Sequence, residues 1–389
     1  MTAFGPTPFG LTTEQQAFAA QVRGHAVELR PVADGGQPGR VNRELLRAMG
    51  HLGLLARLFP SAALPGSAGG QPSSREAPAL DLCLLRESLA TECTEAETAL
   101  ALQGLGSYPV LQSGSDEQVR RWLPAVASGA AVAAFALSEP GAGSDAAALE
   151  LTAEPDGNGW RLTGTKTWIS NAPEADFYTV FARTTPGERA RGVSAFLVPA
   201  ERPGLSGEHL DMVSPHPIGT LTFDGVPVYA DELLGEIDRG FAVAMRTLDK
   251  FRPSVGAFAV GMAQAALEAA CEYAASRTAF GGPLKDQQAV AHLLAEMATR
   301  TEAARLLVYS AAAAIDRGAT GIAGRSAMAK LFATETAQFV VDAAVQIHGA
   351  RALQRGHPLE HLYREVRAPR IYEGASEIQR TIIARQLFK

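Results

Sequence analysis

The hydrophobic periodicity of this chain changes twice, and these two changes constrain its fold more than any other feature. Up to about residue 130, apolar residues recur every three to four positions, as on the buried face of a helix. Between 131 and 235, short runs such as FYTVFAR and VSAFLVP alternate with turns of Gly, Pro, Asn and Asp, which predicts strands. From about residue 241, long Ala- and Leu-rich helical patterns return and continue through Phe388.

We therefore expect an α+β multidomain chain with three domains. Residues 1–130 form an N-terminal helical domain, 131–236 a small central β-barrel or sandwich, and 237–389 an antiparallel four-helix bundle. A chain of 389 residues with 47 % hydrophobic content has enough apolar surface for several cores. The first helix is expected to start with a capping box of Thr12 and Gln15, and the Pro-, Gly- and Ser-rich stretch from Pro60 to Ser74 to be a loop.

The overall charge limits the classes of partner. A net charge of -6 and a pI near 5.8 give no attraction to nucleic acid or to an anionic membrane, so a small-molecule partner is favoured. The residues MTAFGPTPFG lack the pattern of a signal peptide, and no uninterrupted apolar run reaches the roughly 18 residues of a membrane helix. These features predict a cytoplasmic protein that binds neither nucleic acid nor membrane.

The signals for a disulfide or a metal site are weak. Cys83, Cys93 and Cys271 are odd in number and lack paired spacing, which predicts core thiols. The segment HPLEH at 357–361 fits the zinc pattern H-x-x-E-H, but no third ligand is evident, and a solvated basic helix is the better interpretation. No metal site is predicted.

A glycine-rich turn, LSEPGAGSD at 137–145, follows the first predicted strand. Its backbone N–H groups are suited to approach the phosphate or ring of a cofactor, although an ordinary glycine turn is the alternative. Gly141, Gly143 and Ala146 also fit the weak dinucleotide fingerprint G-x-G-x-x-A. That fingerprint requires a helix directly afterwards, whereas LELTAEPDGNGWRLTG predicts a strand and a turn, so we do not expect a Rossmann site.

Four segments together resemble the acyl-CoA dehydrogenase family over almost the whole chain. FALSEPGAGSD and, after a hairpin, GTKTWISN look like the family's double signature. RTAFGGPLKDQQA and the C-terminal IYEGASEIQR match further family segments in order and spacing. The resemblance implies the helix, sheet, helix plan and an FAD cofactor.

The resemblance assigns the flavin contacts residue by residue. They are Phe135, Leu137, Ser138, Gly143, Ser144, Trp168 and Ser170 at the ring and pyrophosphate, Arg277, Phe280 and Gln288 with Gln346 and Gly349 of the complementary loop at the adenine half, and Ala375 and Glu377. Hydroxyl and backbone donors suit the flavin edge, and Trp168 suits the wall of the ring; alone, it would be a core tryptophan.

In the family the adenine contacts cross a subunit boundary, so a homotetramer or a homodimer is implied. The loop QIHGARALQRG departs from the glycine-rich form of the family at Ala350 and Ala352. Alanine is tolerated at these two positions only if φ stays negative. The shape of this loop is therefore the point at which the resemblance is weakest.

Tyr372, Glu373 and Gly374 match the family's catalytic segment. Removing a proton next to a thioester needs a base with a raised pKa, and desolvation among apolar walls raises the pKa of a carboxylate. The resemblance gives this role to Glu373, whose N–H also polarises the thioester carbonyl together with a ribityl hydroxyl of the flavin. Some members carry the base elsewhere, at the position of Phe251, which cannot accept a proton.

The substrate contacts implied by the resemblance include both sides of the acyl thioester. They are Ser144, Asp249, Phe251, Arg252, Tyr372 and Gly374. For Asp249 and Arg252, a helix-surface ion pair is the alternative. Phe251 is expected to shape the acyl pocket.

The implied function is dehydrogenation of an acyl thioester, with hydride transfer to flavin N5 and electrons passed to an electron-transfer flavoprotein. Coenzyme A is the usual carrier, while an acyl carrier protein substrate or a double bond away from the α,β position, in polyketide precursor biosynthesis, are alternatives. Flavin oxidases and monooxygenases share the fold, and Glu373 argues against a monooxygenase. An alternative of another class is a flavin-containing DNA-binding relative without a dehydrogenase role, against which the acidic charge counts.

Overall fold

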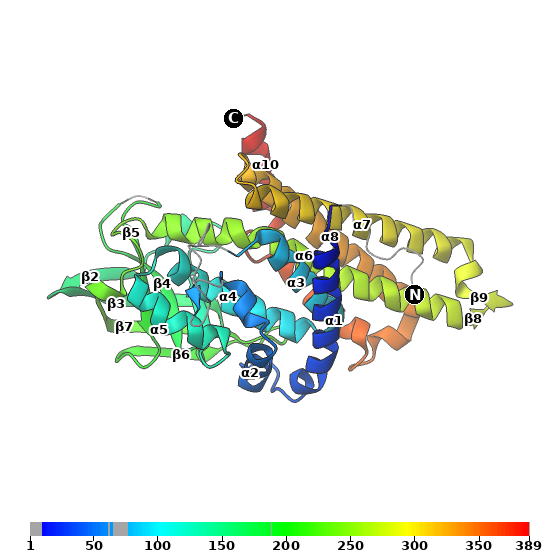
Figure 1. Cartoon of the computed structure of the whole chain (residues 1–389), viewed down its shortest axis with the longest axis horizontal. Helices are drawn as coiled ribbons and strands as arrows, with labels where there is room; N and C mark the ends of the chain where they lie inside the picture. Colours follow the sequence, from blue (N-terminus) through cyan, green and yellow to red (C-terminus); the bar gives the residue numbers. More distant parts are fainter. Residues whose placement is uncertain (1–9, 61–62, 65–76, 188, 389) are drawn as a thin grey trace. The chain divides into compact units, whose positions relative to one another are not determined.

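The computed structural model describes residues 10–60, 63–64, 77–187 and 189–388 (Figure 1). The chain forms two compact units, each made of several segments. Unit 1 comprises Met1–Arg30, Pro78–Glu97 and Asp249–Lys389, and unit 2 comprises Pro31–Ala77 and Thr98–Leu248. Most of the loop expected at Pro60–Ser74 lies outside the described residues. The three expected domain boundaries remain predictions.

The helical pattern before residue 130 forms helices, as expected. They are α1 (Thr13–Asp34), α2 (Arg43–His51), the 3-10 helix η1 (Leu55–Leu58), α3 (Ala79–Glu92), α4 (Thr94–Ser113) and α5 (Asp116–Ala127). The capping box that begins α1 is confirmed, because the Thr12 hydroxyl accepts from the Gln15 N–H at 3.2 Å and the Gln15 side chain accepts from the Thr12 N–H at 3.0 Å.

Unit 2 is built around a curled seven-stranded sheet. Its strands are β1 (Ala133–Ala136), β2 (Thr152–Asp156), β3 (Gly159–Ser170), β4 (Phe177–Arg183), β5 (Val193–Pro199), β6 (Leu205–His209) and β7 (Ile218–Tyr229). The order is β1-β4-β2-β3-β7-β6, and β5 pairs with β4. β1 runs parallel to β4, whereas β3 and β7 form an antiparallel pair with an irregularity between Lys166 and Ile169. β6 was not predicted, because LSGEH contains no apolar run.

Helix α4 is fixed directly to the sheet of unit 2. The Gln103 side chain donates to the carbonyl of Ala131 at 2.6 Å and accepts from the N–H of Ala133 at 2.7 Å. A Cβ on Gly106 would stand 2.6 Å from the backbone nitrogen of Ala134, so this close approach requires glycine. The first strand of the sheet, which leads into the glycine-rich turn, is thereby held rigidly.

Unit 1 is helical. After α6 (Gly240–Ser276), whose first residues belong to unit 2, come a two-stranded hairpin, β8 (Thr278–Ala279) and β9 (Gly282–Pro283), and the helices α7 (Gln288–Asp316), α8 (Ile322–His348), α9 (Pro358–Glu365) and α10 (Ser376–Leu387). Figure 1 shows α7 and α8 side by side, and α8 also contacts α9 and α10. These helices confirm the expected C-terminal bundle.

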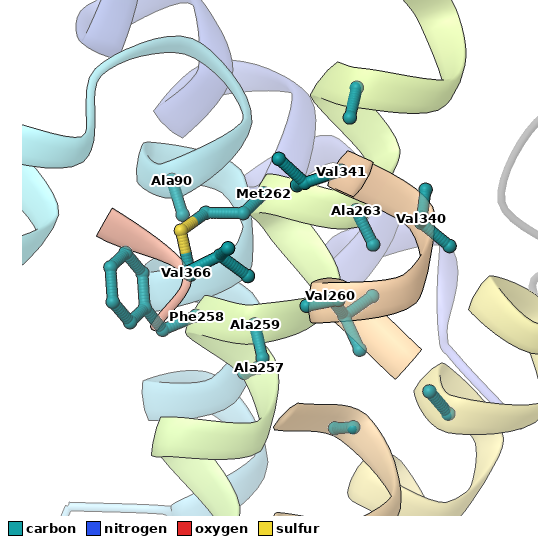
Figure 2. Packing of buried hydrophobic residues seen from close by; sticks show 14 of the residues in the cluster. Ala90, Ala257, Phe258, Ala259, Val260, Met262, Ala263, Val340, Val341 and Val366 are labelled. Carbon is teal, nitrogen blue, oxygen red and sulfur yellow. The ribbon is translucent and has the colours of Figure 1, made fainter. Parts of the chain in front are cut away.

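The core of unit 1 is rich in small side chains. Ala90 of α3, Met262 of α6, Val340 of α8 and Val366 after α9 belong to one buried cluster (Figure 2). A Cβ on Gly261 would lie 2.5 Å from the Glu87 carbonyl oxygen, so α3 and α6 approach very closely. Close helix contacts of this kind hold side chains in defined positions, which an active site requires.

Helix α6 is long and apolar enough to cross a membrane by length and composition. However, 78 % of its most apolar window is buried in the structure. Burial to this extent is typical of a core helix, so the composition of α6 is weak evidence for a membrane span.

Candidate active site

The backbone around Glu373 is strained and firmly held. Glu373 has a φ of 51°, in the left-handed region that non-glycine residues rarely adopt, and Gly374 follows with a φ of 95°. The Glu373 carbonyl accepts from Arg252 Nε at 3.4 Å and from Gln379 Nε2 at 3.2 Å. The Gly374 carbonyl accepts from Lys330 Nζ at 2.7 Å and from Gln379 Nε2 at 2.8 Å. Side chains of α6, α8 and α10 therefore clamp the segment.

The carboxylate of Glu373 is held in a shielded environment. The residue is partly buried, and its Oε2 atom is shielded from solvent without a hydrogen-bond partner among the described residues. Burial raises the pKa of Glu373, while Arg86, Lys330 and Arg252 oppose the rise. A shielded oxygen without a partner is suited to receive a proton from a bound molecule.

The other predicted substrate residues of unit 1 lie on α6 or next to Glu373 in the sequence. Arg252 is buried and pairs with Asp249 at 2.5 Å while it also contacts the Glu373 carbonyl. The predicted ion pair therefore forms, but its cationic end is buried rather than on the surface. Phe251 is 3 % exposed, and burial raises the pKa of the Tyr372 hydroxyl well above its ordinary value.

A buried ion pair connects the two predicted flavin segments of unit 2. Lys166 Nζ pairs with Glu139 Oε1 at 2.7 Å and donates to the Leu137 carbonyl at 3.0 Å. The Ser138 carbonyl accepts from the Thr167 N–H at 3.0 Å. Burial lowers the pKa of Lys166 to about 8, which the attraction of Glu139 opposes. These contacts bring FALSEPGAGSD and GTKTWISN together, as the resemblance requires.

The surface presented by these segments fits a flat cofactor with phosphate groups. Trp168 is 54 % exposed and has a φ of 59°, so its ring stands outside the core rather than in it. Gly143 and Ser144 are exposed, and a Cβ at Gly143 would meet nothing within 4 Å, which leaves the backbone accessible. Phe135 packs on Phe181 with ring centroids 4.9 Å apart. Exposed backbone donors beside an aromatic wall fit FAD.

Three further predicted flavin residues in unit 2 are less accessible. Leu137 is buried and Ser170 is half-buried, as is Ser138. The turn is followed by the 3-10 helix η3 (Ala146–Ala148) and then by β2, so the helix of a Rossmann site does not follow it.

The predicted adenine contacts lie at one end of unit 1. Arg277 and Phe280 follow α6, Gln288 begins α7, and Gln346 and Gly349 stand at the end of α8; all are exposed, Phe280 by 94 %. The stacked rings of Tyr273 and His348, with centroids 4.2 Å apart, place the ends of α6 and α8 together. Neither Ala350 nor Ala352 has a positive φ, so both meet the condition set from the sequence, while Gly349 has a φ of 63°.

Ala375 and Glu377 stand at the start of α10, directly after Gly374. Ala375 is the residue before the helix and is half-buried, whereas the Glu377 side chain is exposed. Both are therefore near the clamped segment in sequence, and neither contributes a donor to it.

The H-x-x-E-H segment does not gather its side chains around one point. His357 caps α9 by accepting from the Leu359 N–H, and Glu360 pairs with Arg364 at 2.7 Å. His361 lies 2.6 Å from the Thr94 hydroxyl. Among the described residues, no group of three or more His, Cys, Asp or Glu side chains could hold a metal ion. The thiols of Cys83 and Cys93 are buried and that of Cys271 is half-buried, and all three are free.

Several residues that hold the site were not predicted. Lys330 and Gln379 clamp the Glu373 segment, Lys166 and Glu139 join the two predicted flavin segments, and Arg86 acts on Glu373 from α3. The available signal was a charged residue inside an otherwise apolar run, as in SAMAKLFA around Lys330. Such a residue must find a partner when it is buried.

Three family models cover almost the whole chain. They are described as acyl-CoA dehydrogenase N-terminal domain, middle domain and C-terminal domain, and match residues 12–130, 134–226 and 238–388. Cyclohexane-1-carbonyl-CoA dehydrogenase of Geobacter metallireducens is 36 % identical over 90 % of each chain. The mitochondrial short-chain specific acyl-CoA dehydrogenase of Bos taurus is 40 % identical over 88 % of this chain and 82 % of its own.

Solved structures agree with these relatives. Butyryl-CoA dehydrogenase from Megasphaera elsdenii has a TM-score of 0.89 at 32 % identity, covering 97 % of this chain and 99 % of that one. A chain solved in work on the electron transferring flavoprotein of Acidaminococcus fermentans has a TM-score of 0.90 at 33 % identity, with coverages of 98 % and 100 %. PigA with FAD and proline gives 0.90 at 27 % identity, with 98 % and 99 %.

Proposed function

This chain belongs to the acyl-CoA dehydrogenase family, and from that premise we propose that Glu373 is the base of its reaction. As a member of this family it is an FAD-dependent oxidoreductase that dehydrogenates acyl-CoA thioesters. The predicted helix, sheet, helix fold and the FAD cofactor are both confirmed. The role of each side chain in the reaction belongs to the proposal.

One observation carries the proposal for Glu373. Its Oε2 atom is shielded and unpartnered, while three side chains fix the backbone on either side of the peptide bond that follows it. A carboxylate with a raised pKa takes up a proton readily, and a fixed backbone keeps it aimed at one carbon. The N–H of Glu373 donates to the thioester carbonyl and stabilises the negative charge that develops there.

FAD, when bound, supplies the acceptor for the hydride that leaves the neighbouring carbon. The residues proposed to hold its ring and pyrophosphate are those on the FALSEPGAGSD and GTKTWISN segments, with Trp168 as the wall of the ring. Their exposed donors and the open space at Gly143 support this assignment. The exposed residues after α6 and at the end of α8 are proposed to hold the adenine half.

The proposed partners are a second copy of the chain and an electron-transfer flavoprotein. The contacting helices α7 and α8 expose four apolar side chains, Leu306, Leu307, Met328 and Phe332, which supports a subunit interface. We propose a homotetramer or homodimer in the cytoplasm. Electrons collected on a bound cofactor must pass to an acceptor before the next turnover, and the similarity to a chain solved in work on an electron transferring flavoprotein supports a flavoprotein in this role.

The experiment that tests this proposal is anaerobic mixing of the FAD-loaded protein with a panel of acyl-CoA and acyl-carrier-protein thioesters. We expect acyl-CoA thioesters to bleach the flavin absorbance and to yield a double bond between the carbons α and β to the carbonyl. A deuterium at the α carbon should slow the bleaching. Reduction by carrier-protein thioesters alone, or a double bond elsewhere in the chain, would show that the substrate or the position is wrong.

A further inference from the structure

Arg86 and Glu87, two neighbouring residues of α3, are buried charged residues with separate partners. The Arg86 side chain is 2 % exposed, pairs through Nε with Glu97 of α4 and donates through Nη1 to the Ser254 hydroxyl of α6 at 2.7 Å. Glu97 is itself 1 % exposed. A buried ion pair loses much of its Coulomb attraction to desolvation, so stability alone is a weak reason for its presence.

The Arg86 guanidinium is tied to the backbone of the proposed base through one turn of α6. The Ser254 hydroxyl that accepts from Arg86 donates to the carbonyl of Phe251 at 2.7 Å. The next residue is Arg252, whose Nε donates to the Glu373 carbonyl. A displacement of Arg86 is therefore transmitted to the segment that holds the base.

Charges from several elements face the same carboxylate. Glu373 is acted on by Arg86 of α3, Lys330 of α8 and Arg252 of α6, in that order of strength. Glu97 of α4 and Glu373 repel each other, and Glu365 of α9 faces Glu97 as well.

Two further groups belong to this electrostatic environment. Tyr372 faces both Glu97 and Arg86, and Glu377 of α10 faces Lys330. Burial raises the pKa of Glu97, and the attraction of Arg86 opposes this rise.

We propose that Arg86, anchored by Glu97 and Ser254, is a positioning residue for Glu373, which sets how readily the carboxylate ionises and holds the α6 turn that carries Arg252. The inference rests on the proposed role of Glu373 as the base. Arg86 contributes the cation that favours the ionised carboxylate, and Glu97 limits how strongly this cation acts.

A second buried ion pair in the same unit provides a matched control. Glu87, the residue after Arg86, accepts from Arg305 Nε at 2.8 Å and from the Tyr309 hydroxyl at 2.9 Å. Arg305 also donates to Gln264 at 2.8 Å. Glu373 is among the charges that act on Glu97, whereas neither Glu87 nor Arg305 is among those that act on Glu373. Glu87→Gln therefore repeats the chemical change of Glu97→Gln away from the base.

The test is the pH dependence of flavin reduction by an acyl-CoA that reduces the wild-type holoenzyme, measured for three variants. Removal of a facing cation in Arg86→Gln should raise the apparent pKa of the base by about one unit. Glu97→Gln leaves Arg86 uncompensated and should lower this pKa. Glu87→Gln should leave the profile in place, and Arg86→Lys, which keeps the charge, should move it less than Arg86→Gln.

A second readout does not depend on turnover. The difference in melting temperature between each variant and its Glu373→Gln double variant, followed against pH, reports the ionisation of Glu373 in the folded protein. Opposite shifts for Arg86→Gln and Glu97→Gln by both readouts support the inference. If Arg86→Gln does not fold, Glu97→Gln decides alone: a lowered pKa supports the role of Arg86, and an unchanged pKa overturns it.

Failure of this inference is distinguishable from failure of the proposed function. If Glu373→Gln bleaches the flavin at the wild-type rate, Glu373 is not the base and the proposed function is wrong in that respect. If Glu373→Gln is inactive but neither Arg86→Gln nor Glu97→Gln moves the profile, Glu373 remains the base and Arg86 has only a structural role.

Discussion

Trp168 and Glu373 share a rare backbone conformation but are held in place by different means. Both have a positive φ, 59° for Trp168 and 51° for Glu373. Trp168 interrupts the pairing of β3 with β7, between the buried residues Thr167 and Ile169. Glu373 lies outside regular structure, where side-chain donors fix its carbonyl and that of Gly374.

This difference agrees with the roles proposed for the two side chains. A strained residue of this kind costs on the order of 1–3 kcal/mol and persists only where its surroundings enforce it. The sheet enforces the strain at Trp168 from the backbone and leaves the ring 54 % exposed, ready for a cofactor. Around Glu373 the enforcing side chains hold the backbone carbonyls, and two of them, Lys330 and Arg252, also act to lower the pKa of the carboxylate.

The largest effect is expected from removing the carboxylate alone. Glu373→Gln keeps the shape and the backbone clamp but cannot accept a proton, so flavin reduction by an acyl-CoA should slow by about 10³-fold. FAD content should stay at the wild-type level, because Trp168 and the flavin segments are untouched. Stopped-flow absorbance under anaerobic conditions measures both quantities. Loss of FAD with the rate would mean that Glu373 serves binding rather than proton transfer.

Substitution of Trp168 should lower the affinity for FAD, the quantity that Glu373→Gln leaves unchanged. Trp168→Ala removes the aromatic wall, and we expect FAD affinity to fall about tenfold, in line with the free energy of an aromatic contact. Trp168→Gly removes the same ring but also relieves the left-handed backbone.

The two Trp168 variants should therefore lose FAD affinity equally, measured by fluorescence titration, while Trp168→Gly melts at the higher temperature. A wild-type affinity in both variants would place the flavin ring elsewhere. Equal melting temperatures would show that the strain at this residue is negligible.

More of the fold than of the contacts that hold the candidate site could be predicted from the sequence. Changes of hydrophobic period predict the helix, sheet, helix order, since periodicity is a local property. β6 escaped prediction because its side chains alternate between half-buried and exposed without an apolar run. The division into two units, whose segments alternate along the sequence, was not predicted either, because α1, α4 and α6 each contribute residues to both units.

The proposed base and flavin segments could be predicted because they form contiguous motifs. Lys330 and the Gly374 carbonyl are 44 positions apart, and Lys166 and Glu139 are 27 apart. Pairs of this kind exist only once the helices or strands have packed, so a single sequence does not reveal them. For Ala350 and Ala352 the sequence set only the condition that φ stay negative, which both residues meet in the structure.

Lys166 and Lys330 are both fully buried, and each can be substituted separately. Lys166 tests the contacts that join the flavin segments, and Lys330 tests those that hold the backbone at Gly374. Burial lowers the pKa of both Lys166 and Lys330 to about 8. Lys330→Met removes a donor to Gly374 and a cation facing Glu373, so the apparent pKa of the base should rise by about one unit and the rate at pH 7 should fall up to tenfold. Lys166→Met should instead weaken FAD binding and leave this pKa in place.

A pH profile of flavin reduction and an FAD titration of each lysine variant make the comparison. A shift of the base pKa in Lys166→Met, or loss of FAD in Lys330→Met, would show that the contacts of the two lysines do not act separately. Lys330→Gln, which keeps a donor but not the charge, should recover the backbone clamp without recovering the pKa.

The smallest expected effect concerns stability. Because the pKa of Glu373 is raised in the folded protein, the unfolded state binds fewer protons between the ordinary glutamate pKa and the raised one, and stability falls as pH rises through this window. Glu373→Gln lacks this loss, so above the window it should melt roughly 1–2 °C higher than the wild type, and at acidic pH the two should melt together.

Glu335 supplies a control of opposite sign for this stability effect. Partial burial acts to raise its pKa, but hydrogen bonds from Ser376 and Arg370 outweigh it and the pKa is lowered. Its contribution to stability is therefore present above the ordinary glutamate pKa and is lost as pH falls, so Glu335→Gln should melt lower than the wild type near neutral pH. Calorimetry of both variants from pH 4 to 9 measures the pair. If Glu373→Gln melts lower at every pH, the carboxylate stabilises the fold and is not the strained, ionisation-resistant group that distinguishes this site from Trp168.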